Sequence, residues 1–186
     1  MKDENVERMD KDTRSPLRYQ ISPFDSAPIS VMNALSLLLD RDETDCLLVS
    51  RIWTILLDSS YGTGKGAMGH LAHILSQEED KTGLKTQYLS GDQVFLGPGC
   101  SLYQCLENGG SAVAKVFGKR YIAITFLTDD YLYFFDPLYG TEFPKGVEKE
   151  SLSNANGKVK LSLLSEAVPA HDEEWGKERE LLLLEM

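Results

Sequence analysis

The hydrophobic pattern of this 186-residue chain changes part-way along, and the change restricts the folds that are open to it. Up to about residue 110, apolar residues recur at the spacing of helix faces. From Ser111 onward, short β-branched or aromatic runs are separated by turn residues. Helices followed by antiparallel strands are typical of α+β proteins, because each helix must bury its apolar stripe against another element. We therefore predict an α+β fold whose N-terminal helical half packs on one face of a C-terminal antiparallel β-sheet.

Four helices are predicted before the strands. The first covers residues 29–39, with Pro28 in its first turn, where a missing N–H costs nothing. The second follows Asp42, and the third runs from about residue 65 to 77. A short fourth helix is expected to begin at the capping box Ser101–Gln104 and to end at the Asn108-Gly109-Gly110 stop. The side chains expected to face inward on the first three helices are Val31, Met32, Leu35, Leu38, Val49, Ile52, Trp53, Leu56, Met68, Leu71, Ala72 and Leu75.

The strands are expected to begin as an antiparallel meander. The runs that predict it are Ser111–Phe117, Tyr121–Leu127 and Tyr131–Phe135. Two further strands are predicted over Val159–Leu164 and Glu180–Leu184, the second of which is short enough to be a closing helix instead. Residues 145–158 are rich in Ser, Asn, Gly and charge, which predicts a surface loop.

The N-terminal segment and the net charge of the chain indicate where the protein is located and which partners are not expected. Residues 1–16 carry too little apolar surface to order themselves, so we expect a frayed tail and then one domain over residues 17–186. The tail lacks the apolar stretch of a signal peptide, which predicts a cytoplasmic protein, and no segment is apolar enough to predict a membrane span. A formal net charge of -10 with scattered basic residues repels phosphate backbones, so nucleic acid is not an expected partner.

No motif predicts a cofactor or a metal. The three cysteines are Cys46, Cys100 and Cys105. Because they lack CxxC spacing, neither disulfides nor structural zinc are expected. His70 and His73 lie three residues apart on the predicted third helix, a spacing that can bind a metal, but a solvated helix face is the preferred interpretation. Gly62-Thr-Gly-Lys65-Gly66 lacks the full spacing of a phosphate loop and is interpreted as a turn and helix start.

The segment before the first predicted helix is the most informative motif. It runs from Tyr19 to Pro28 and resembles the start of papain-like cysteine peptidases, especially the bacteriocin-leader (double-glycine, peptidase C39-like) group. In that group a Gln precedes a Cys-Gly-Pro sequence, and the helix that opens there lowers the thiol pKa and stabilises an oxyanion. Gln20 and Pro28 match, whereas Ser26 stands in the position of the cysteine and Ala27 in that of the glycine. A serine hydroxyl has a far higher pKa than a thiol, so it would need a neighbouring base.

A second segment, from Arg120 to Asp136-Pro137, resembles the histidine strand of the same group, a tight turn and a strand ending in Asp-Pro. The resemblance puts Arg120 in the position of the general base and Asp136 in that of the carboxylate that orients it, yet arginine stays protonated. Over residues 17 to 140 it therefore implies a papain-like scaffold without catalysis, which binds a peptide or protein partner in the former cleft. The residues equivalent to the catalytic set are Gln20, Ser26, Arg120 and Asp136, and the first three are the candidate ligand-binding residues.

Other interpretations of these residues stay open. Ser26 could cap the first helix, Arg120 could form a structural ion pair with Asp136, or Arg120 and Gln20 could hold a carboxylate at the helix N-terminus. An active peptidase or acyltransferase with Ser26 as nucleophile would need a base, either Lys119 or a histidine brought close by the fold. A scaffold subunit without a cleft function would instead present a large exposed apolar patch. The sequence specifies neither the partner nor the oligomeric state.

Overall fold

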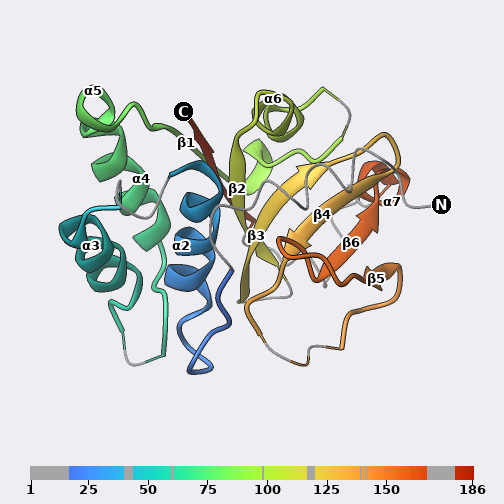
Figure 1. Ribbon diagram of the computed structural model, residues 1–186, viewed down its shortest axis with the longest axis horizontal. Coiled ribbons are helices and arrows are strands. Elements are labelled where there is room, and N and C mark those ends of the chain that lie inside the picture. The colour runs from blue at the N-terminus through green and yellow to red at the C-terminus, as the bar shows by residue number, and fades with distance from the viewer. Residues whose placement is uncertain are drawn as a thin grey trace.

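A computed structural model describes residues 17–39, 44–59, 61–97, 99–116, 120–138, 140, 142–166 and 179–186 (Figure 1). The helices are α2 (Ser26–Leu38), α3 (Cys46–Leu56), α4 (Ala67–Gln77), α5 (Glu79–Thr82), α6 (Ser101–Glu107) and α7 (Leu161–Glu166). The strands are β1 (Lys85–Ser90), β2 (Ser111–Val116), β3 (Arg120–Leu127), β4 (Tyr131–Phe135), β5 (Val147–Lys149), β6 (Gly157–Lys160) and β7 (Glu180–Glu185). The 3-10 turn η2 (Gly91–Gln93) follows β1.

The strands form one antiparallel sheet in the order β1-β7-β2-β3-β4-β6-β5. The predicted meander is confirmed, because β2 pairs with β3 and β3 pairs with β4 in antiparallel register. The predicted C-terminal strand is also confirmed, since β7 lies between β1 and β2, with Leu182 opposite Tyr88 on one side and Val113 on the other. A β-bulge between Ile124 and Phe126 shifts the register of β3 against β4.

Helices cover both faces of the sheet, which corrects the prediction of a single covered face (Figure 1). On one face, α2, α3 and α4 enclose a core that includes Val113 of β2 and Leu182 of β7. On the other face, α6 and Leu164 of α7 pack with Ile122 of β3. Because both faces are buried, β7 is apolar at the four consecutive positions Leu181–Leu184 instead of alternating. The α+β class, with helices packed on an antiparallel sheet, is confirmed.

The four predicted helices are confirmed with changes in their bounds and faces. Every inward residue predicted on α2 and α4 is buried. On α3 the buried row is Leu48, Ile52 and Leu56, so Val49 and Trp53, which were predicted to face inward, are only half-buried. The spacing alone therefore located the helix but placed its apolar face about one residue off.

Serine caps neither α2 nor α6, contrary to both predictions. The N-cap of α2 is Asp25, and Ser26 is the first helical residue, with no side-chain cap bond. The capping box predicted to open α6 at Ser101 does not form either. One forms instead at Ser90 and Gln93, where it opens the 3-10 turn.

The run Val159–Leu164 is a strand for only two residues, which corrects the prediction of a strand throughout. Strand β6 ends at Lys160, and the chain turns into α7 where the Leu161 N–H donates to the Asp130 carbonyl at 2.9 Å. In the helix, Leu164 reaches the core beneath α6. An apolar run this short fits either period, so the sequence did not distinguish them.

The predicted surface loop over residues 145–158 is wrong in two respects. It contains strand β5, which pairs with β6, and it buries Leu152, Asn154 and Ala155. A polar segment can be buried in this way because its backbone bonds to itself, as where the Leu152 N–H donates to the Ala155 carbonyl at 3.0 Å.

Some predictions fall outside the described residues, namely the tail over residues 1–16 and Lys119. Within the described part of the chain, no helix is long and apolar enough to cross a membrane.

Candidate functional site

The four candidate residues, which lie far apart in the sequence, come together where α2 begins, β3 begins and β4 ends. Ser26 opens α2, and its Oγ accepts a hydrogen bond from the Tyr121 N–H of β3 at 3.3 Å. The N–H of Gln20 donates to the carbonyl of Pro137, directly after Asp136, at 2.8 Å. The fold therefore assembles in one place the residues that the sequence pattern singled out.

Arg120 and Asp136 form an ion pair at the centre of this region, which confirms the prediction of a structural pair. The guanidinium Nη2 lies 3.0 Å from Oδ2 of Asp136, and their side chains are 20% and 0% exposed. The other carboxylate oxygen, Oδ1, accepts from the Leu138 N–H at 2.9 Å. A carboxylate withdrawn this far from water needs a cation and hydrogen-bond donors, and both are present.

Ser26 holds α2 on the sheet. It is 7% exposed, and one turn later Ser30 donates from its Oγ to the Tyr121 carbonyl at 2.9 Å. Two serines of one helix face therefore bind the two backbone groups of Tyr121. This contact explains why Ser26 does not cap α2, because its hydroxyl is turned toward β3.

No histidine among the described residues lies beside this serine hydroxyl as a hydrogen-bond partner. His70 and His73 are exposed on α4, which packs mainly on β1 and α3. His73 Nε2 lies 3.2 Å from the Gln77 amide nitrogen. The prediction of a solvated helix face is confirmed for both histidines.

The loop before α2 is shaped by a buried carboxylate. Asp25 is 3% exposed and accepts from the N–H groups of Ile21 and Ser22, both at 3.1 Å. Gln20 donates from its amide to the Ser22 carbonyl at 2.8 Å. Its other amide atom, Oε1, is buried, and in the described structure no donor lies within hydrogen-bond distance of it. This oxygen is an acceptor that a bound N–H could satisfy.

Exposed apolar side chains line the same loop. Tyr19, Ile21 and Phe24 are 42%, 90% and 47% exposed, and Tyr19 packs on Phe135 at a ring-centroid distance of 5.0 Å. The loop at Gly62 approaches the Phe24 backbone so closely that an added Cβ would lie 3.0 Å from its carbonyl oxygen. The candidate site thus has a polar centre and an apolar rim.

Asn156 belongs to this site but was not identified from the sequence. Its Oδ1 accepts from the Asp136 N–H at 2.8 Å, and its Nδ2 donates to the Asp136 carbonyl at 2.7 Å. In the sequence it precedes Gly157 in a polar stretch, a pattern typical of a turn. Only the pairing of β4 with β6 brings it beside Asp136.

A buried polar cluster lies behind Tyr121. The Tyr121 hydroxyl donates to Glu180 at 3.1 Å, and Glu180 also forms an ion pair with Lys115 at 3.0 Å. Burial, followed by the nearby charge of Glu180, raises the pKa of Tyr88 to about 12. This cluster joins β1, β2, β3 and β7 beneath the site, and its groups satisfy one another.

The remaining motifs do not assemble a site. The Gly64 N–H donates to the Asp58 carboxylate at 2.7 Å, so an acidic side chain occupies the place where a phosphate loop would bind its anion. Among the described residues, no group of three or more His, Cys, Asp or Glu side chains could hold a metal ion. Cys46 is exposed, Cys100 and Cys105 are buried, and all three are free thiols.

A cavity of about 480 Å³ lies at the opposite end of α2, lined by Leu39, Leu48 and Leu84 beneath a rim with Arg51 and Glu78. Since α2 has 13 residues, this cavity is about 20 Å from Ser26 along the helix. It therefore belongs to a different part of the surface from the candidate site.

Comparisons with known proteins give a structural likeness but no match of sequence. No family model matches this sequence, and no curated protein is similar to it at a significant level. Among solved structures, the chain is similar to a double-glycine motif protease from an AMS/PCAT transporter, which was crystallised in complex with the leader peptide. The two are 10% identical with a TM-score of 0.49, and the match covers 92% of this chain and 91% of that chain. A likeness of this size carries no argument about the site, so neither the activity nor the peptide of that protease is transferred to this chain.

Proposed function

We propose that this protein binds a peptide or protein partner at the site around Gln20, Ser26 and Arg120 without catalysing a reaction there. The observation that supports this proposal is the ion pair between Arg120 and Asp136, at 3.0 Å. A guanidinium does not release its proton in proteins, so Arg120, which precedes on β3 the residue that is hydrogen-bonded to Ser26, is not a general base. The pair instead neutralises the buried carboxylate.

The surroundings of Ser26 support the same proposal. The residue is 7% exposed and its hydroxyl accepts from a backbone N–H, whereas a nucleophilic serine must pass its proton to an adjacent base. With His70 and His73 exposed on α4, neither is a hydrogen-bond partner of this hydroxyl.

The chemistry of the rim favours a peptide as the ligand. A peptide offers backbone N–H groups for Gln20 Oε1 and apolar side chains for Tyr19, Ile21 and Phe24. The charge of Arg120 is already balanced by Asp136, which favours an uncharged segment over a free carboxylate. The net charge of -10 disfavours phosphate-bearing ligands further.

A binding experiment with a Gln20→Met variant tests the proposal. The probe is a positional-scanning library of octapeptides blocked at both ends, read by fluorescence anisotropy. Gln20→Met removes the acceptor Oε1 and also the amide bond to the Ser22 carbonyl, so it should lower the unfolding free energy by about 1 kcal/mol and weaken the best peptides about tenfold. Gln87→Met, on the exposed position of β1, is the matched control and should bind as the unaltered protein does. Absence of any peptide whose binding depends on Gln20 would refute the proposal.

Intact-mass spectrometry tests the enzymatic alternative directly. The protein is incubated with activated acyl esters, thioesters and short peptides, alongside a Ser26→Ala control. We expect no stable mass increase. An adduct or a hydrolysis product that is lost in the Ser26→Ala control would establish catalysis and overturn the proposal.

A further inference from the structure

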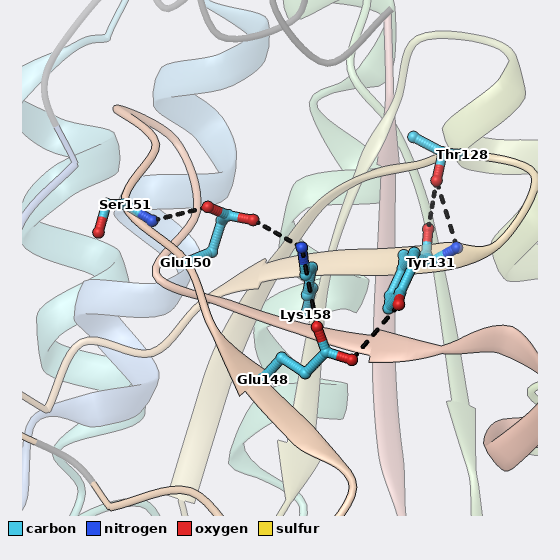
Figure 2. A network of polar contacts seen from close by, with 6 residues as sticks. All are labelled: Thr128, Tyr131, Glu148, Glu150, Ser151 and Lys158. Carbon is cyan, nitrogen blue, oxygen red and sulfur yellow. Dashed lines mark hydrogen bonds and ion pairs between the residues drawn. The ribbon is translucent and has the colours of Figure 1, made fainter. Parts of the chain in front are cut away.

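A charged network one strand away from Asp136 anchors the segment over residues 150–156. Figure 2 shows Lys158 of β6 between two carboxylates, with Glu150 at 2.9 Å and Glu148 at 3.9 Å. The Lys158 ammonium also lies 5.0 Å from the centroid of the Tyr131 ring. The hydrogen bond to Glu150 raises the pKa of Lys158, so the charged form of this lysine is the one that the network favours. Glu150 in turn accepts from the Ser151 N–H at 3.1 Å, at the start of the segment.

The segment closes on itself and is held to the sheet by apolar packing. The Glu150 N–H donates to the carbonyl of Asn156 at 2.9 Å, which joins the two ends. Between them, Leu152 and Ala155 are buried and belong to a cluster that contains Phe126. The segment is therefore fixed at its base by charge and at its middle by burial.

Asn156 transmits this anchoring to the site. Its side chain receives the Asp136 N–H and donates to the Asp136 carbonyl, which extends the pairing of β4 with β6 by one residue. An amide supplies one acceptor and donors in this arrangement, whereas an ionised carboxylate of the same shape supplies acceptors only. Without the Asn156 amide, the N–H and the carbonyl of Asp136 would lose these hydrogen bonds.

We propose that Asn156 is the positioning residue of the Arg120–Asp136 pair, and that the Lys158–Glu150 contact latches the segment that carries it. Asn156 fixes the backbone of Asp136, and the carboxylate of Asp136 fixes the guanidinium. The geometry of the site then depends on a lysine that does not touch it. The inference concerns the free protein, and it rests on the proposed function only for its effect on ligand binding.

The first test is Asn156→Asp, read from the Nε–Hε nuclear magnetic resonance signal of Arg120 in the free protein. The substitution keeps the shape, removes the donor and adds a negative charge beside the Asp136 carbonyl. Hydrogen exchange at Arg120 should become about tenfold faster, with a changed chemical shift, while unfolding stays cooperative. Asn108→Asp is the matched control, since Asn108 also precedes a glycine but is exposed at the end of α6. An unchanged Arg120 signal in folded Asn156→Asp would overturn the inference.

The second test distinguishes the effect of the Lys158–Glu150 contact from the effect of removing any positive charge from β6. Lys158→Met should speed exchange at Arg120 about threefold, whereas Lys158→Arg, which can still reach Glu150, should restore it. Lys160→Met is the control, because Lys160 also lies over the Tyr131 ring, at 6.0 Å, but is exposed. Equal effects of Lys158→Met and Lys160→Met would refute the latch.

Peptide binding to Asn156→Asp distinguishes this inference from the proposed function. A changed Arg120 signal with unchanged Gln20-dependent binding supports the positioning role and contradicts a role for Arg120 in binding. An unchanged signal with binding that depends on Gln20 supports the proposed function and contradicts the positioning role.

Discussion

Removing either member of the Arg120–Asp136 pair should destabilise the protein, but by unequal amounts. Arg120→Met removes the cation from a fully buried carboxylate that accepts from the Leu138 N–H, which should cost about 3 kcal/mol of unfolding free energy. Asp136→Asn keeps an oxygen for that donor and leaves an arginine whose side chain is 20% exposed, so the loss should be about 1–2 kcal/mol. The double variant should resemble Asp136→Asn, which corresponds to a coupling energy of about 3 kcal/mol.

Urea unfolding followed by tryptophan fluorescence and by circular dichroism measures these losses, provided that the two probes give coincident transitions. Arg18→Met is the matched control, since Arg18 is exposed and its described hydrogen bonds are made by its backbone. Lowering the pH to about 4 should reduce the deficit of Arg120→Met, because protonation removes the unpaired buried charge. The reasoning fails if Arg120→Met costs no more than Arg18→Met, or if Asp136→Asn costs as much as Arg120→Met.

Three further predictions concern the serines of α2 and the cysteine thiols. Ser26→Ala should lower the unfolding free energy by about 1 kcal/mol, because it leaves a buried N–H without its acceptor, and Ser30→Ala should cost a similar amount in the same urea assay. A loss from Ser26→Ala well below that from Ser30→Ala would contradict the docking role. Iodoacetamide at pH 8 should label the exposed Cys46 and spare Cys105, which is fully buried. Burial also raises the pKa of the Cys105 thiol from 9.0 to about 12, so little of the reactive thiolate forms at pH 8. Because the folded pKa lies above the unfolded one, the stability contributed by the Cys105 thiol is present below pH 9 and falls between pH 9 and 12, so Cys105→Ala should flatten the decline of the urea midpoint in that range.

The sequence predicted the parts of the fold that have strong local patterns. The buried faces of α2 and α4 were predicted from the helical spacing of their apolar residues, and the β2–β3–β4 meander from short apolar runs separated by turn residues. Strand β1 was missed because its residues, Lys85–Ser90, are largely polar, as expected at a sheet edge. Its strand character comes from pairing with β7, which lies about a hundred residues later and which local propensity does not encode.

The residues of the candidate site also divide into those that the sequence could identify and one that it could not. Gln20, Ser26, Arg120 and Asp136 could be singled out because each stands in a motif, and the fold brings them together. Asn156 stands in no motif, and it was assigned to a surface loop because residues 145–158 are rich in Ser, Asn, Gly and charge. Its role arises from two side-chain bonds to one residue across a strand pair, and no period or spacing carries such information.

The choice of arginine at position 120 follows from the burial of Asp136. A carboxylate with no exposed surface, next to a proline that donates no N–H, is stabilised by a cation, and arginine keeps its charge at every pH at which the chain is folded. A neutral histidine could still donate an N–H to the carboxylate, but it would not balance its charge. Arginine at this position therefore supplies no general base and at the same time stabilises the end of β4, which agrees with the binding role that we propose.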